Sequence, residues 1–125
     1  MINFTSLEKL VIEKMLNENF GLSLGKAGQS LEIEKREFSL DVSDSDCCVG
    51  FYVHFKNNDF LGGVGGIPHH ISLHADHDWL PAGGDFILFL KPDGCVDFLE
   101  ATFYGFSMPI SDLVAESHHF NLKMV

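Results

Sequence analysis

The residues best suited to chemistry gather in the stretch PHHISLHADHDW (68–79), which holds four of the seven histidines of the chain beside two aspartates. Imidazole and carboxylate groups are good ligands for zinc and other first-row metal ions. We therefore predict that this stretch could hold a divalent metal such as zinc. The candidate ligands are His69, His70, His74, Asp76 and His77.

The spacing of these residues decides which of them could share one ion. In a regular strand His70 and His74 stand on one face but about 13 Å apart, at ~3.3 Å per residue, which is too far for a single ion. A helix would place them one turn apart, but Pro68 and its neighbours give little support for a helix. A bent loop could bring His74, Asp76 and His77 together.

The same stretch is also typical of a solvated polar loop, or of a pH-responsive or partner-binding patch. No Lys or Arg stands between Lys56 and Lys91. The interval contains the aspartates Asp59, Asp76, Asp78 and Asp85, so its formal charge is −4 while its histidines are neutral. Protonation of the four histidines, below their usual pKa of about 6.5, would bring that charge close to zero. We therefore also consider a pH-sensitive surface here.

Other chemical motifs are weak. The glycine-rich GGVGG (62–66) lacks the Lys-Ser/Thr of a phosphate-binding loop, and Ile67-Pro68 follows it, so we expect a turning loop. No G-x-S-x-G is present, and a Cys48 or Cys95 pair with His54 would form only if the fold joined them. We assign no catalytic or cofactor-binding residue, and the question of an enzyme stays open, leaning towards none.

Composition excludes several classes of protein. The 125 residues include 8 Lys+Arg against 18 Asp+Glu, a formal charge of −10, which argues against binding nucleic acid. No apolar run approaches the ~18 residues of a membrane helix, and the N-terminus lacks the features of a secretory signal. Three cysteines, two of them adjacent, do not form a disulfide framework. We expect a cytoplasmic protein that binds neither membrane nor nucleic acid.

The elements that must position these residues begin with a helix. Thr5-Ser6-Leu7-Glu8 fits a capping box, in which a hydroxyl and a carboxylate each accept from an otherwise unpaired backbone N–H. Leu7, Leu10, Val11 and Met15 then recur at helical spacing and predict a face that docks on a sheet.

The rest of the chain favours strands. Alternating patterns occur over 31–34, 38–42 and 48–55. FILFLK (86–91) is almost wholly apolar, which suits a central strand buried on both faces. Lys91-Pro92-Asp93-Gly94 is a tight turn, so 86–104 should form a long β-hairpin.

The remaining segments are assigned as follows. Residues 67–74 should be extended and 75–85 a loop. A short helical turn is expected from Ser111, and a terminal strand through Phe120, Leu122 and Met124. Glu100 stands among apolar neighbours in the hairpin, and Arg36, the only arginine, is its candidate partner.

This order of elements predicts one globular domain over 1–125 of the α+β class. Its N-terminal helix should pack on a mostly antiparallel sheet of four to six strands, arranged as a meander, in two layers. The twelve phenylalanines should fill the core between them.

Three stretches of the chain resemble a group of small uncharacterised bacterial proteins. They are the opening amphipathic helix, REFSLDVSDSDCCVGFYVHF (36–55) and GGDFILFLKPDGCVDFLEATFYGFSMP (83–109). The chain departs from the group's pattern at Ala101, where the group has Gly, and at 106–109, where the group has an acidic-aromatic sequence. The resemblance implies one helix on an antiparallel sheet and no known activity.

Three functions are compatible with these observations. The first is a non-enzymatic domain that acts by protein–protein contact, with a protein partner or a second copy in a homodimer, in an interaction or regulatory role. The second is a metal-binding, hydrolase-like protein that uses the His/Asp cluster. The third is a small-molecule binder with a Phe-lined pocket between helix and sheet.

Overall fold

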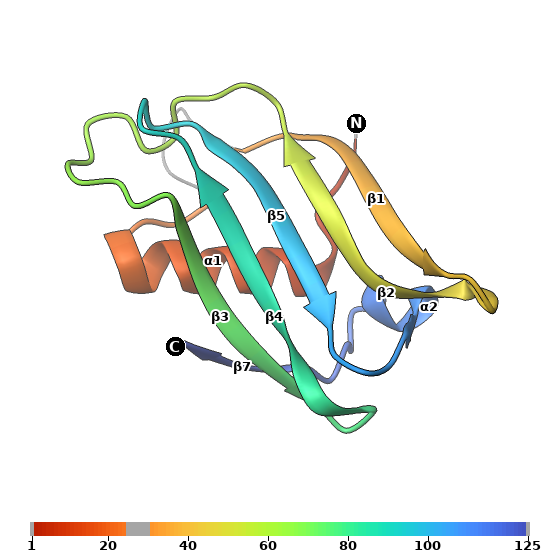
Figure 1. The fold of residues 1–125 in the computed structure, drawn as a ribbon. Coiled ribbons are helices and arrows are strands. Elements are labelled where there is room, and N and C mark those ends of the chain that lie inside the picture. The colour runs from red at the N-terminus through yellow and green to blue at the C-terminus, as the bar shows by residue number, and fades with distance from the viewer. Residues whose placement is uncertain (1, 25–30, 125) are drawn as a thin grey trace.

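The computed structural model describes residues 2–24 and 31–124. Its two helices and seven strands are drawn in Figure 1. In chain order they are α1 (Ser6–Phe20), β1 (Ile33–Asp41), β2 (Asp44–Phe55), β3 (His70–His77), β4 (Leu80–Leu90), β5 (Val96–Phe103), β6 (Met108–Pro109), α2 (Ile110–Leu113) and β7 (Asn121–Met124).

Helix α1 begins as its sequence predicts. The Glu8 backbone N–H donates to the Thr5 hydroxyl at 3.1 Å, and the Thr5 N–H donates back to the Glu8 carboxylate at 3.0 Å. The helix ends at Gly21, whose φ of 67° suits a residue without a side chain. Its buried face includes Leu7, Val11 and Met15, whereas Leu10 is 45% exposed and lies outside that face.

The strands form one antiparallel sheet in the order β1-β2-β5-β4-β3-β7, with β6 paired to β2. Helix α1 lies against one face of this sheet (Figure 1). We call the face on the side of α1 the inner face and the opposite one the outer face. The α+β class and the two-layer arrangement are thereby confirmed, with six strands in line and the two-residue β6 in addition.

The predicted meander is wrong at one point. Strand β2 pairs with β5 rather than with β3, because the connection over 56–69 carries the chain across the end of the sheet before β3 begins. The Leu61 N–H donates to the Gly94 carbonyl at 2.9 Å and so holds this connection against the β4–β5 turn. Sequence periodicity identifies strands but does not determine which of them become neighbours.

The β4–β5 hairpin is confirmed, with its turn closed by the Gly94 N–H donating to the Lys91 carbonyl at 3.0 Å. The prediction that 75–85 is a loop is wrong. Strands β3 and β4 form a second hairpin in which His77 pairs with Leu80 and only Asp78 and Trp79 turn. Aspartates, prolines and glycines in this stretch resemble loop residues, yet the strand pairing overrides that preference.

Six of the twelve phenylalanines are buried, and several of these form a cluster on the inner face of the sheet, whereas Phe106 is 52% exposed. The Phe51 ring lies 6.2 Å from that of Phe86 and 6.3 Å from that of Phe103, measured between centroids. Phe120, just before β7, contacts the same two neighbours at 6.2 and 6.1 Å. Burial of each such side chain contributes roughly 1.5–3 kcal/mol, so this cluster is a main source of stability.

Candidate functional site

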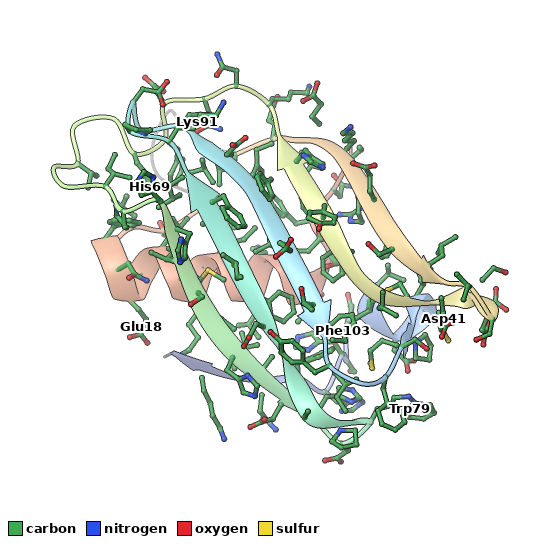
Figure 2. All side chains as sticks on the ribbon, in the orientation of Figure 1. Glu18, Asp41, His69, Trp79, Lys91 and Phe103 are labelled. Atoms are coloured by element: carbon green, nitrogen blue, oxygen red, sulfur yellow. The ribbon has the colours of Figure 1, made fainter. Side chains whose placement is uncertain are left out.

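The outer face of the sheet carries a row of aromatic side chains across four strands. Cross-strand pairing places His70 beside Phe89, Phe89 beside Phe98, and Phe98 beside His54. Tyr52 stands two residues before His54 on β2 and adds a fifth ring. We call these five residues the aromatic strip. Figure 2 looks onto the face that bears them, where side chains project from β2, β5, β4 and β3 with no helix in front.

The rings of the aromatic strip contact one another. Phe89 and Phe98 are stacked, with centroids 4.4 Å apart and planes inclined by 18°. The centroid of Phe98 lies 5.7 Å from that of His54 and 6.2 Å from that of Tyr52. The centroid of His70 lies 6.0 Å from that of Phe89. All five side chains keep part of their surface exposed, so the strip is an ordered aromatic surface rather than core.

A single carboxylate stands at the centre of this face. Glu100 on β5 pairs with Tyr52 of β2 on one side and with Ile87 of β4 on the other. A hydrogen bond to Glu100, together with its negative charge, raises the pKa of the Tyr52 hydroxyl. The prediction that Arg36 is the partner of Glu100 is wrong. Arg36 instead donates to Glu8 of α1 at 2.6 Å.

A second group of polar side chains centres on His74. Its Nδ1 lies 2.9 Å from Asp85 of β4, and its Nε2 lies 3.2 Å from Asp76 of β3. The Tyr104 hydroxyl donates to the other oxygen of Asp85 at 2.6 Å, and Lys123 of β7 pairs with Asp76 at 2.7 Å. The chain of contacts therefore ties three neighbouring strands and the end of β5 together. We call these five residues the His74 network.

The pKa values follow from these contacts. The hydrogen bond to Asp85 raises the pKa of His74, although burial opposes it, and Asp76 adds to the rise. Burial alone would raise the pKa of Asp85, but hydrogen bonds from Tyr104 and His74 outweigh it and the pKa is lowered. The hydrogen bond from Lys123 lowers the pKa of Asp76. Each shift favours a protonated His74 that donates from both ring nitrogens to two carboxylates.

The five predicted metal ligands are dispersed rather than gathered. His69 precedes β3 and is exposed, and His70 belongs to the aromatic strip. His74 and Asp76 are in contact, whereas His77 lies at the far end of β3 with its ring 4.6 Å from that of Phe120. Figure 2 shows the length of this stretch, with His69 and Trp79 at opposite ends of β3.

Within the part of the chain that the structure describes, no group of three or more His, Cys, Asp or Glu side chains is arranged to hold a metal ion. The reason is the regular strand. His70 and His74 share a face of β3 but stand four residues apart, too far to bind one ion, as the strand spacing predicts. Both ring nitrogens of His74 face carboxylates. The metal site at these residues stays a prediction.

The C-terminal histidines lie beside the end of β3, because β7 pairs with that strand. His77 Nε2 lies 3.1 Å from the His118 carbonyl oxygen, and the Phe120 N–H donates to the His118 ring at 3.1 Å. Burial, followed by the neighbouring His119 and His77, lowers the pKa of His118. These contacts position the segment that leads into β7.

The cysteines offer no activated nucleophile. All three are free, and Cys48 and Cys95 are buried. Burial raises the pKa of the Cys48 thiol to about 11, which keeps it protonated near neutral pH. His54, considered as a base for either thiol, instead lies 2.9 Å from the Glu37 carboxylate.

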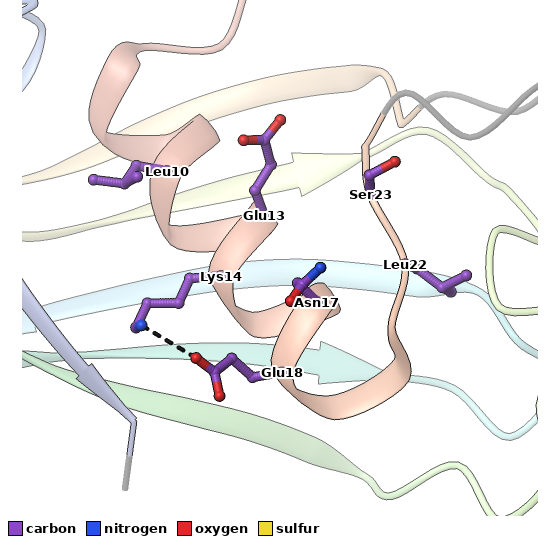
Figure 3. Close-up of a pocket in the computed structure, with 7 residues that line it drawn as sticks. All are labelled: Leu10, Glu13, Lys14, Asn17, Glu18, Leu22 and Ser23. Atoms are coloured by element: carbon purple, nitrogen blue, oxygen red, sulfur yellow. Dashed lines mark hydrogen bonds and ion pairs between the residues drawn. The ribbon is translucent and has the colours of Figure 1, made fainter.

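A shallow groove of about 470 Å³ follows the side of α1 that faces away from the sheet (Figure 3). Leu10, Asn17 and Leu22 contribute to its lining, and the ion pair between Lys14 and Glu18 lies within it at 3.3 Å. Among the residues that the structure describes, no phenylalanine lines it. It is therefore a different feature from the Phe-lined pocket between helix and sheet that a small-molecule binder would use.

Comparison with known proteins adds no further information, since the chain matches no protein-family model, no curated protein and no solved structure. The resemblance to small bacterial proteins stays a prediction. No helix within residues 2–24 and 31–124 is long and apolar enough to cross a membrane.

The aromatic strip is not apparent from any single sequence motif. Its members are distributed over 52–98 and come together only through the strand order, in which β5 lies between β2 and β4. One indication is present in the sequence, because FILFLK (86–91) does not alternate. Side chains on both faces of that strand are apolar.

Proposed function

We propose that this protein is a non-enzymatic interaction domain that binds a protein partner through the outer face of its sheet. The aromatic strip and Glu100 would form the centre of the contact. Strands β2, β5, β4 and β3 would present it on a rigid support.

The observation that carries this proposal is the two-sided apolar character of β4. Phe86, Leu88 and Leu90 point to the inner face and are at most 5% exposed. Ile87 and Phe89 point to the outer face and remain partly exposed. An antiparallel strand with one solvated face normally alternates apolar and polar residues. A strand that is apolar on both faces but covered on one is expected to be covered by another molecule.

The composition of the outer face supports the same conclusion. Aromatic residues are enriched at the centres of protein interfaces, where they supply a large contact area at a low cost in conformational entropy. The stacked pair Phe89 and Phe98 is already ordered, with ring centroids 4.4 Å apart. Little side-chain freedom would be lost when a partner covers it.

The contacts of His74 support a structural role rather than a catalytic one. Both of its ring nitrogens face carboxylates at 2.9 and 3.2 Å, so neither points towards open solvent for a substrate or a metal. The His74 network lies further along the same face, beyond the pair of Ser72 and Ile87, and fixes the relative position of β3, β4 and β7. It would therefore stabilise the edge of the binding surface.

A pull-down with matched variants tests the proposal. The bait is the full chain, and the double variant Phe89→Thr/Phe98→Thr removes the stacked pair while keeping residues that suit strands. Leu10→Thr is the control, because Leu10 is also apolar and 45% exposed but lies on α1. We expect a defined protein retained by the wild type and by the control and lost with the double variant. Equal retention by all three would contradict the proposal.

A further inference from the structure

We infer that the outer face recognises a cationic side chain, an arginine of a basic partner protein, which would place its guanidinium on Tyr52 and Phe98 and against the Glu100 carboxylate. This inference rests on the proposed function and names the chemistry of the partner. The site would be the triangle formed by these three residues, which we call the Glu100 site.

The geometry of the Glu100 site follows from the strand register. Glu100 and Phe98 stand two residues apart on β5 and so share the outer face. Tyr52 lies directly across from Glu100 on β2, and its ring centroid is 6.2 Å from that of Phe98. A carboxylate is thus bordered by two aromatic rings that are themselves in contact, while Ile87 closes the side towards β4.

The charge of Glu100 has no cationic partner within residues 2–24 and 31–124. Other acidic residues of the outer face do have one. Asp76 pairs with Lys123, Asp97 with Lys91, and Glu37 with Lys35. The Tyr52 hydroxyl beside Glu100 is a neutral group, with its pKa raised by this carboxylate, and it supplies no positive charge. A partly buried carboxylate among aromatic rings gains most from a cation supplied by another molecule.

The only arginine of the chain cannot supply that cation. Arg36 is held on the inner side by Glu8, with Nε 2.6 Å and Nη2 2.5 Å from the carboxylate oxygens. The whole chain carries a formal charge of −10, which favours association with a basic partner over an acidic one. Charge complementarity thus points to a cationic protein as the occupant of this face.

The aromatic rings select arginine over lysine. A guanidinium is planar and weakly hydrated, stacks on aromatic faces and can bind a carboxylate through two N–H groups at once. An ammonium group is compact and more strongly hydrated, so it would gain less from the rings of Tyr52 and Phe98. The Glu100 site offers the carboxylate and the partly exposed ring of Tyr52, and the ring of Phe98, which is stacked on Phe89, borders it.

The test is a titration of the full chain with N-acetylarginine methylamide, followed by NMR of the aromatic rings and backbone amides. N-acetylcitrulline methylamide has nearly the same shape as the arginine probe but no charge. The lysine analogue carries the positive charge but lacks the planar guanidinium group. We expect saturable shifts at Tyr52, Phe98 and Glu100 with the arginine probe, weaker ones with lysine and none with citrulline. Equal shifts with arginine and citrulline, or stronger binding of lysine, would overturn the inference.

Variants localise the effect. Glu100→Gln keeps the shape of the side chain and should weaken arginine binding by roughly tenfold, as expected for a charge-assisted contact. Asp97→Asn, on the same strand but paired with Lys91, is the matched control and should leave binding unchanged. Phe98→Leu tests the ring independently, should Glu100→Gln disturb the fold. Wild-type affinity in both Glu100→Gln and Phe98→Leu would overturn the inference.

Two outcomes separate this inference from the proposed function. A partner whose retention depends on Phe89 and Phe98, without any binding of the arginine probe, would reject the Glu100 site and keep the interaction surface. A dimer seen by sedimentation that disappears in Phe89→Thr/Phe98→Thr would identify a second copy as the occupant. That result would overturn the assignment of a basic partner protein.

Discussion

Glu8 and Arg36 form a bidentate ion pair between the first turn of α1 and strand β1. The Glu8 side chain is 1% exposed and that of Arg36 is 16% exposed. Glu8 also accepts from the Thr5 N–H, so one carboxylate both caps the helix and fastens it to the sheet. The pair fixes the end of α1 over the inner face and thereby leaves the outer face as the uncovered side.

Replacement of the arginine should be costly because it leaves a buried carboxylate without its cation. We expect Arg36→Met to lower the free energy of unfolding by about 3 kcal/mol. The double variant Glu8→Gln/Arg36→Met should lose less, since the introduced amide keeps a carbonyl for the Thr5 N–H and carries no charge. Urea unfolding followed by circular dichroism measures both. A double variant less stable than Arg36→Met would contradict this interpretation.

The His74 network should make stability depend on pH. The pKa of His74 is raised in the folded state. The stabilisation that protonated His74 gives the fold is therefore complete below the unfolded pKa of about 6.5 and is lost as pH rises through the folded pKa. The pKa values of Asp76 and Asp85 are lowered, so both carboxylates stay ionised until the pH falls towards their folded values. The window in which the network stabilises the fold lies between these limits.

We therefore expect His74→Gln to lose more stability at about pH 5.5 than at about pH 9, measured as the difference in unfolding free energy from the wild type. His69→Gln is the control, because among the described residues the His69 ring makes no hydrogen bond and lies outside β3. A deficit of His74→Gln that is the same at both pH values would show that protonation of His74 does not contribute.

Gly83 should be intolerant of a side chain because it lies against His74. Its φ is +66°, and a Cβ there would stand 2.6 Å from the Ala75 carbonyl oxygen and 2.7 Å from His74 Nε2. Gly105 has a similar φ of +77° but nothing within 4 Å of such a Cβ. We expect Gly83→Ala to destabilise by about 2 kcal/mol more than Gly105→Ala. Equal losses in thermal or urea unfolding would contradict the crowding at His74.

The raised pKa of Cys48 should protect its thiol. A change from the ordinary 9.0 to about 11 reduces the thiolate fraction by about two orders of magnitude at pH 8. Burial and Asp44 also raise the pKa of Cys47, but its side chain is only partly buried, so iodoacetamide should modify Cys47 well before Cys48 in the folded protein. Peptide mass spectrometry resolves the two rates. Modification of Cys48 at the rate measured in urea would be inconsistent with its burial.

Local patterns predict the elements where residue type determines the backbone. The Thr5–Glu8 capping box and the turn at Lys91–Gly94 are such cases, and both occur as predicted. The loop prediction for 75–85 is wrong because its Asp, Pro and Gly residues favour turns, while pairing with neighbouring strands holds it extended. Strand order is not predictable in this way, because periodicity contains no information on which edges meet.

The candidate site depends on the order of the strands, which sequence periodicity does not reveal. FILFLK (86–91) correctly indicates a central strand with two apolar faces, but the expected burial of both faces is wrong, since Ile87 and Phe89 remain partly exposed. The sequence identifies Glu100 as a carboxylate in apolar surroundings, but its predicted partner Arg36 is the wrong one. Only the register of β5 between β2 and β4 places Glu100 beside Tyr52 on an open face.

The most direct test of the outer face as the binding surface is photo-crosslinking in cells that express the full chain. Benzoylphenylalanine is placed at Phe89 on the outer face in one variant. In the other variant it is placed at Leu10, on the side of α1 that faces away from the sheet. We predict a protein adduct of defined mass at Phe89, reduced by a second change of Glu100→Gln, and none at Leu10. An adduct at Leu10 with none at Phe89 would contradict the account.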